Sequence, residues 1–222
     1  MKFQNLRVYS ANIDSQLKFY KKLGFEIRNA SEDAFEIVCG YSVLQFIARE
    51  HSQPYHIAFH IPDRQEEEAL QWLEKLVPVL GFNDDKIIDF ENWQAKSLYF
   101  YDEDKNIMEF ISRRDFKKPD SGIFEAKSIV GIAEVGMATT NIRRQFEKLQ
   151  AVAGLEKFDG DLERFCATGD PSGLFIVINK DKKDWFPVGD TAYSADFEVE
   201  FSHDSINYSA TFKEGELQLK SI

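Results

Sequence analysis

The stretch "SQLKFYKKLGFEI", residues 15–27, decides the fold that this sequence predicts. It continues a helical spacing of apolar residues that begins at Ile13 and includes Leu17, Tyr20 and Leu23. Gly24 can adopt the left-handed conformation that ends a helix, and residues 25–31 then have the composition of a strand. Strands are also expected at residues 1–10, 34–40 and 42–50, so the chain opens with a strand, a helix and three strands.

The same order of elements recurs along the chain. A strand is expected at residues 55–62 and a helix at 63–81, which Pro78 should kink or end early. Three strands follow at 86–92, 96–104 and 106–114. The ends of the two units align, "VLQFIARE" (43–50) over "IMEFISRR" (107–114), which places Gln45 against Glu109. A repeated unit that cannot bury its own sheet face implies that the copies pair.

A third unit follows a stretch rich in charge that contains Pro119 and Gly122. Its strands are expected at 129–140, 162–170 and 173–180 and its helix at 141–154, while the tail (195–204, 206–214 and 216–222) has strands only. We therefore predict an α+β fold: two tandem domains of paired βαβββ units whose curled mixed sheets form a cup. The expected domains are 1–115 and a degenerate second domain at 128–222, joined by a linker at 116–127.

Two motifs resemble those of the vicinal oxygen chelate superfamily, which includes glyoxalases, extradiol dioxygenases and bleomycin resistance proteins. The family pattern FYxxLGF is matched at residues 19–25, and DPDGNxxE is matched in part at residues 102–109, where Glu103 replaces the usual Pro and Lys105 the usual Gly. The resemblance covers the first half of the chain well and the second half in outline. It implies a cup that holds a metal ion or a ligand.

Composition narrows the range of functions. The 222 residues carry a formal net charge of −11, which disfavours nucleic acid and anionic membranes as partners. The 20 Phe residues favour wide apolar cores that border cavities for small molecules. Two cysteines, Cys39 and Cys166, form no disulfide framework. No signal peptide or spanning segment is recognisable. We expect a cytoplasmic monomer or homodimer with a small-molecule ligand.

His56 and His60 lie four residues apart on one expected strand, and they therefore share a face. Four residues of a strand rise about 13 Å, which is too far for both to bind one ion. At most one is a ligand, and the resemblance selects His56.

The resemblance also implies the other ligands of the metal. Glu109 matches the family carboxylate of the last strand, and counting by the family spacing reaches Asn5 and Gln45. The candidate metal site is therefore Asn5, Gln45, His56 and Glu109, for a divalent ion such as Mn²⁺, Mg²⁺, Ni²⁺, Fe²⁺ or Zn²⁺, without an organic cofactor. Because two of these groups are neutral amides, the alternative is a metal-free polar network in which Glu109 accepts hydrogen bonds from His56 and the amides.

Further residues are candidates for contact with a ligand. Tyr101 is a candidate proton donor beside Glu109, and Tyr99 shares its face; the alternative is an ordinary pair of strand aromatics. Arg7 and Tyr9 share the face of Asn5 and could bind a carboxylate. His60 is a candidate acid or base, or packs in the sheet. Trp93 would line the cup or cover a loop.

The second half is expected to bind no metal. The same counting reaches Glu134 and Phe175, and an apolar residue at the second position leaves no ligand pair. Trp185, Phe186 and Pro187 are expected to clamp a loop onto the core, with a lid over a small-molecule site as the alternative.

Two functions remain open at this point. The first is a metal-assisted lyase, isomerase or dioxygenase, in which Glu109 both binds the ion and moves a proton. The second is binding or sequestration of a small hydrophobic compound without turnover.

Overall fold

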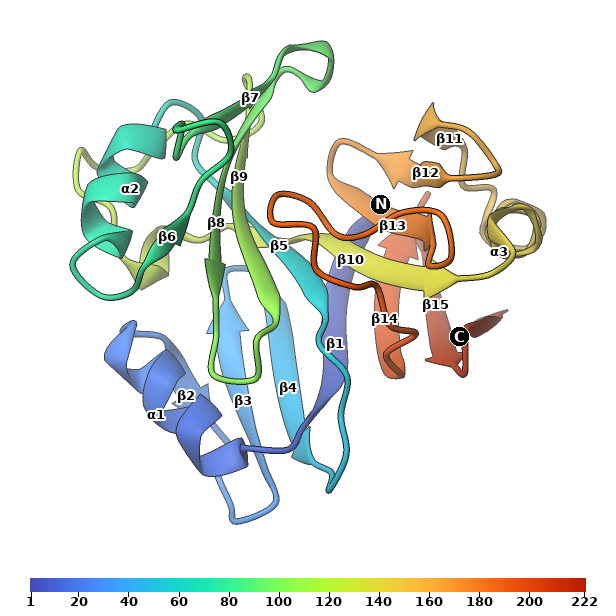
Figure 1. Ribbon diagram of the computed structural model, residues 1–222, viewed down its shortest axis with the longest axis horizontal. Coiled ribbons are helices and arrows are strands. Elements are labelled where there is room, and N and C mark those ends of the chain that lie inside the picture. The colour runs from blue at the N-terminus through green and yellow to red at the C-terminus, as the bar shows by residue number, and fades with distance from the viewer.

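The computed structural model describes residues 1–222 and shows a mixed α+β fold (Figure 1). The first unit contains β1 (Lys2–Ser10), α1 (Ile13–Lys22), β2 (Glu26–Arg28), β3 (Ala34–Cys39) and β4 (Ser42–Ala48). The second contains β5 (His56–Ile61), α2 (Glu66–Leu73), β6 (Val79–Leu80), β7 (Ile88–Phe90), η1 (Glu91–Trp93), β8 (Ala95–Tyr101) and β9 (Ile107–Arg113).

The second half begins with η2 (Ala126–Ser128) and continues with a third unit and a tail. The third unit contains β10 (Gly131–Thr139), α3 (Ile142–Ala153), β11 (Lys157–Gly160), β12 (Phe165–Asp170) and β13 (Gly173–Asn179). The tail contains β14 (Phe197–His203), β15 (Ile206–Lys213) and β16 (Glu216–Ser221), and it has no helix. The predicted order of elements is confirmed except for the short strands β6 and β11, which were not expected, and the boundaries of the two predicted domains stay a prediction.

Local signals in the sequence explain several boundaries. α1 is followed by Gly24 at φ +82°, where a residue with a Cβ would be strained. α2 ends at Leu73, ahead of Pro78, as the proline predicts. α3 begins after Asn141, whose side chain accepts a hydrogen bond from the Arg144 backbone N–H, and ends at Gly154 at φ +68°. No helix is both long and apolar enough to cross a lipid bilayer.

The strands form two sheets, and each sheet combines strands from both halves of the chain (Figure 1). Sheet A has the order β16-β15-β14-β1-β4-β3-β2 and joins the first unit to the tail. Sheet B has the order β11-β12-β13-β10-β5-β9-β8-β6, with β7 paired to β8, and joins the second unit to the third. The first two units were expected to pair with one another, but each instead pairs with a unit from the second half.

The two sheets share one core and turn their other faces outward. Leu6 and Val8 of sheet A belong to the same buried cluster as Ile57 and Phe59 of sheet B. Because side chains alternate along a strand, Asn5 and Arg7 lie on the opposite face of sheet A, and His56 and Ala58 on the opposite face of sheet B. Each sheet therefore offers an outward face on which polar residues can gather.

Candidate metal centre

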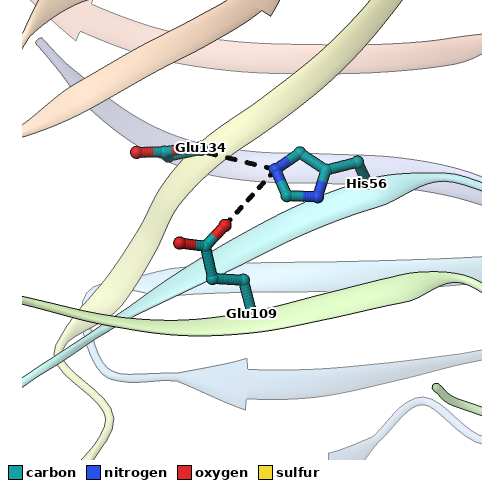
Figure 2. A group of neighbouring side chains, drawn as sticks. All are labelled: His56, Glu109 and Glu134. Atoms are coloured by element: carbon teal, nitrogen blue, oxygen red, sulfur yellow. Dashed lines mark ion pairs between the residues drawn. The ribbon is translucent and has the colours of Figure 1, made fainter. Parts of the chain in front are cut away.

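Three buried side chains meet on the outer face of sheet B: His56 of β5, Glu109 of β9 and Glu134 of β10 (Figure 2). Each offers one donor atom, and these atoms all lie within 4.8 Å of one another. His56 Nε2 lies 3.4 Å from Glu109 Oε2 and 4.0 Å from Glu134 Oε2. One ring nitrogen therefore faces two carboxylates that come from the strands on either side, and the three groups offer a donor set for one metal ion.

The register of the sheet explains why these side chains meet. β5 lies between β9 and β10, and Ala58 pairs with Glu109 on one side and with Glu134 on the other. Ala58 is fully buried between these two register partners, and its side chain is only a methyl group. His56 lies two residues before Ala58 and therefore points to the same face.

A β-bulge in β10 brings Glu134 to this face. The register with β5 shifts between Ile132 and Glu134. Ile132 packs in the shared core, as do Val135 and Met137 further along β10, so the alternation of the strand changes phase at the bulge. Ala133 and Glu134 can then both face outward, which is how a bulge re-aims side chains beside a site.

Each carboxylate has a hydrogen-bond donor behind it. Ser97 Oγ donates to Glu109 Oε1 at 2.5 Å. Arg113 Nη2 donates to Glu134 Oε1 at 2.6 Å, and both of these side chains are almost fully buried. The guanidinium of Arg113 also lies over the ring of Trp93, 5.5 Å from its centroid. These donors leave the Oε2 atoms of both carboxylates directed to His56.

Burial changes the acidity of the cluster. Burial and, to a smaller extent, the neighbouring Glu134 carboxylate raise the pKa of Glu109 to about 7, while His56 opposes the change. Burial also raises the pKa of Tyr99 well above its usual value, and the two glutamates add to this effect. Desolvated carboxylates that lie this close together favour a cation among them.

The cluster lies at the wall of a cavity of about 700 Å³. Its other lining is largely aromatic and aliphatic and includes Phe90, Trp93, Tyr99, Phe165, Ile176 and Phe186. Charged residues also line it, among them Asp89, Asp159, Arg164 and Lys183. The size and the apolar walls suit a small organic molecule with an oxygen-bearing end at the cluster.

Trp185 covers His56 from the loop between β13 and β14. The two rings stack with centroids 5.1 Å apart and an interplanar angle of 27°. Gly136 of β10 makes this possible, because a Cβ there would lie 2.8 Å from Trp185 Cη2 and 3.0 Å from His56 Cβ. Trp185 also lines the cavity, so the loop that carries it forms part of the cavity wall.

The four residues expected to meet lie in two places. Asn5 and Gln45 line a separate hollow of about 300 Å³ on sheet A, while His56 and Glu109 line the cavity on sheet B. The reason is the sheet topology, since β1 and β4 pair with each other and with the tail rather than with β5 and β9. Asn5, Gln45, His56 and Glu109 therefore do not form one shared site, and His56 and Glu109 lie instead beside Glu134.

Four of the other candidates lie away from the cavity. Arg7 and Tyr9 both bond to Glu198 on sheet A. His60 is fully buried, stacks on Phe116 with ring centroids 4.2 Å apart, and places Nε2 3.2 Å from the Ser172 carbonyl oxygen. Tyr101 donates to Asp190 Oδ2 at 2.6 Å and thereby holds the loop that carries Trp185.

Two of the candidates line the cavity. Tyr99 is buried beside Glu109, and Trp93 donates to Asp159 Oδ2 at 2.5 Å. Sequence reasoning did not consider Arg113, and it rejected Glu134 as a ligand. The signal for Glu134 was present, because the unit spacing reaches it, and the apolar Phe175 led us to expect no metal ligand in the second half.

Comparison with solved structures identifies the fold. A candidate dioxygenase from Bacillus subtilis subsp. subtilis str. 168 superposes on this chain with a TM-score of 0.63 at 12% identity. The match covers 100% of this chain and 84% of the dioxygenase chain. The chain has the vicinal oxygen chelate fold. Two variants of glyoxalase I from Zea mays share it, with TM-scores of 0.57 and 0.58 at 10% identity, over 99% of this chain and 92% and 93% of theirs.

The likeness concerns the vicinal oxygen chelate fold and not the sequence. No family model matches the chain, and no curated protein does. Within this fold the His56, Glu109 and Glu134 cluster belongs to two units from different halves of the chain, so a functional proposal depends on the geometry described above.

Proposed function

We propose that the chain is a metal-dependent enzyme of the glyoxalase and dioxygenase type, in which His56, Glu109 and Glu134 hold a divalent ion. The observation that carries the proposal is the convergence of three buried donor atoms within 4.8 Å at the wall of the cavity. Ligand atoms about 2.1 Å from one ion lie about 3.0–3.4 Å apart. The separations of 3.4 and 4.0 Å around His56 Nε2 need only a small contraction.

The chemistry of the donors supports a transition metal. One imidazole and two carboxylates form a mixed nitrogen and oxygen set, which suits Mn²⁺, Fe²⁺ or Zn²⁺ better than the oxygen-only sites typical of Mg²⁺. Three protein ligands leave positions open for a substrate. When bound, such an ion would polarise two neighbouring oxygens of the ligand and stabilise negative charge on them.

The residues of the chain have separate parts in this proposal. Arg113 holds Glu134 in place through one oxygen and leaves the other free. Ser97 does the same for Glu109. Trp185 stacks on His56 and keeps water from one side of the imidazole. The aromatic lining of the cavity would bind the apolar part of a small molecule that carries two neighbouring oxygens, on which the chain would act as a lyase, isomerase or dioxygenase.

The test is metal content in protein purified without chelator. Wild type should carry one divalent ion per chain, and Glu134→Ala and Glu109→Ala should lose it. The matched control is Asn5→Ala/Gln45→Ala, which removes the two amides on sheet A and should keep the ion. Metal absent from wild type even after addition of Mn²⁺, Fe²⁺ and Zn²⁺, or full occupancy in Glu134→Ala, would overturn the proposal.

A second candidate is binding without turnover, and the apolar lining of the cavity favours it. The two are separated by offering molecules with two neighbouring oxygens, such as catechols and α-hydroxy ketones, to the metal-loaded protein. Product formation that disappears in Glu134→Ala supports the enzyme. Saturable binding with no conversion of any bound compound supports the binding protein.

A further inference from the structure

Sheet A repeats the arrangement of the metal centre at the level of strand register. On sheet B, Ala58 pairs with Glu109 in the parallel strand and with Glu134 in the antiparallel strand. On sheet A, Arg7 pairs with Gln45 in the parallel strand and with Glu198 in the antiparallel strand. Arg7 therefore occupies the same register position in sheet A that Ala58 occupies in sheet B.

The equivalence extends to the whole cluster. Gln45 corresponds to Glu109, Glu198 to Glu134, and Asn5, two residues before Arg7, to His56. Asn5, Arg7, Gln45 and Glu198 line one hollow on the outer face of sheet A. The residue that differs most in size and charge between the two clusters is the one at the centre, an arginine on sheet A and an alanine on sheet B.

The guanidinium of Arg7 bonds to the two residues that correspond to the carboxylates of sheet B. Its Nε donates to Gln45 Oε1 at 2.7 Å, and its Nη1 donates to Glu198 Oε2 at 2.9 Å. Around this pair, Asn5 Nδ2 donates to Glu200 Oε2 at 2.6 Å and Gln45 Nε2 donates to Glu36 Oε1 at 3.3 Å. A positive group thus lies among oxygen atoms at the centre of the hollow.

We propose that Arg7 is a built-in cation that fills, on sheet A, the space that a divalent ion would take on sheet B. An arginine side chain stays protonated across the physiological range of pH, so this charge is permanent and needs no supply of metal. The hollow of sheet A is then a latent cation site that Arg7 keeps closed, and the chain has one metal centre rather than two. The comparison rests on the proposed metal centre of sheet B.

The test rebuilds the donors of sheet B in sheet A. The variant Asn5→His/Arg7→Ala/Gln45→Glu places an imidazole and a new carboxylate beside Glu198, around an alanine, in the register of the sheet B cluster. The matched control is Asn5→His/Gln45→Glu, which has the same donors but keeps Arg7. Mn²⁺ stoichiometry is measured by elemental analysis after gel filtration, and folding is checked by circular dichroism.

We expect the triple variant to bind one more Mn²⁺ per chain than the control. The extra ion should disappear when Glu198→Gln is added to the triple variant. A folded triple variant without an extra ion would overturn the proposal, and so would an extra ion in the control, because Arg7 would then not be what excludes it.

A single substitution keeps the proposal testable if the triple variant does not fold. Arg7→Ala leaves Glu198 without its cation, so Mn²⁺ should raise its melting temperature more than that of Arg7→Ala/Glu198→Gln. Equal shifts in these two variants would count against the proposal. Both comparisons are made between variants of sheet A and test only the role of Arg7. The metal content of wild type tests the centre on sheet B. A negative result for Arg7 is therefore distinguishable from a negative result for the proposed function.

Discussion

Ala58 lies opposite Glu109 on one neighbouring strand and opposite Glu134 on the other. The candidate metal centre thus depends on a side chain that takes no part in binding. A residue with more than a methyl group at this position would occupy the space between the carboxylates. The site therefore requires a small side chain at position 58 as well as the three donors.

Ala58→Val should weaken metal binding by roughly 10–100-fold, the usual effect of disturbing the surroundings of metal ligands. The added methyl groups would also cost about 1–3 kcal/mol of stability through overpacking. Titration with Mn²⁺ checks the affinity. The control is Phe59→Leu, on the opposite face of the same strand, which should lose stability but keep its affinity for Mn²⁺. An equal loss of affinity in both variants would refute the role given to Ala58.

Gly136→Ala should displace Trp185 from His56, because the new Cβ would lie 2.8 Å from Trp185 Cη2. We expect Trp185 to become more accessible to water, and its fluorescence to become more sensitive to acrylamide, than in wild type. The same measurement on Trp185→Phe and Trp185→Phe/Gly136→Ala isolates the signal of this residue. If quenching increases equally with and without Trp185, the displaced group is not Trp185.

Arg113→Met should destabilise the metal-free protein by about 3–5 kcal/mol, because it leaves the buried carboxylate of Glu134 without its partner. Arg113→Met/Glu134→Gln should recover a large part of that loss, since no buried charge is then unpaired. Urea unfolding with chelator present measures both values. Additive effects of the two substitutions would show that the ion pair does not couple these residues.

His60 should make the protein less stable in mild acid. Burial, together with the nearby Arg113 charge, lowers the pKa of His60 to about 3, while the Ser172 carbonyl and Asp170 oppose this change. Below about pH 6.5 the unfolded chain takes up a proton that the folded chain does not, so stability falls as pH falls. Between about pH 7 and pH 5 this should cost about 2 kcal/mol.

The variant His60→Gln retains a donor for the Ser172 carbonyl and does not titrate. Urea unfolding at both pH values should therefore show a smaller loss of stability in the variant than in wild type. Identical losses would mean that His60 takes up its proton in the folded state as readily as in the unfolded chain.

Local patterns were sufficient to predict most elements of this fold. The spacing of Ile13, Leu17 and Tyr20 predicts α1, and Pro78 predicts that α2 ends early. These signals act through neighbours in the sequence, on backbone conformation and on which face of an element is apolar. Two short strands were missed. β6 (Val79–Leu80) lies within the segment expected as helix, and the alternation of β11 within Lys157–Gly160 is too brief to detect.

The pairing of strands that lie far apart in sequence could not be predicted in the same way. Alternation in β1 shows that Asn5 and Arg7 share a face, but not whether β5 or β14 lies beside them. His56 and Glu109 were assigned together because both match ligand positions of the family that the motifs resemble. Glu134 required knowledge that the second unit pairs with the third, and the bulge before it has no signature in the sequence.

The pairing of β1 with β14 has a consequence for synthesis on the ribosome. Lys2 lies in register with Ser202, so this edge of β1 stays uncovered until β14 has been synthesised. Exposed strand edges invite association with other chains, and closing so long a loop is slow. Nascent chains of this protein would therefore need protection of β1 until β14 has left the ribosome.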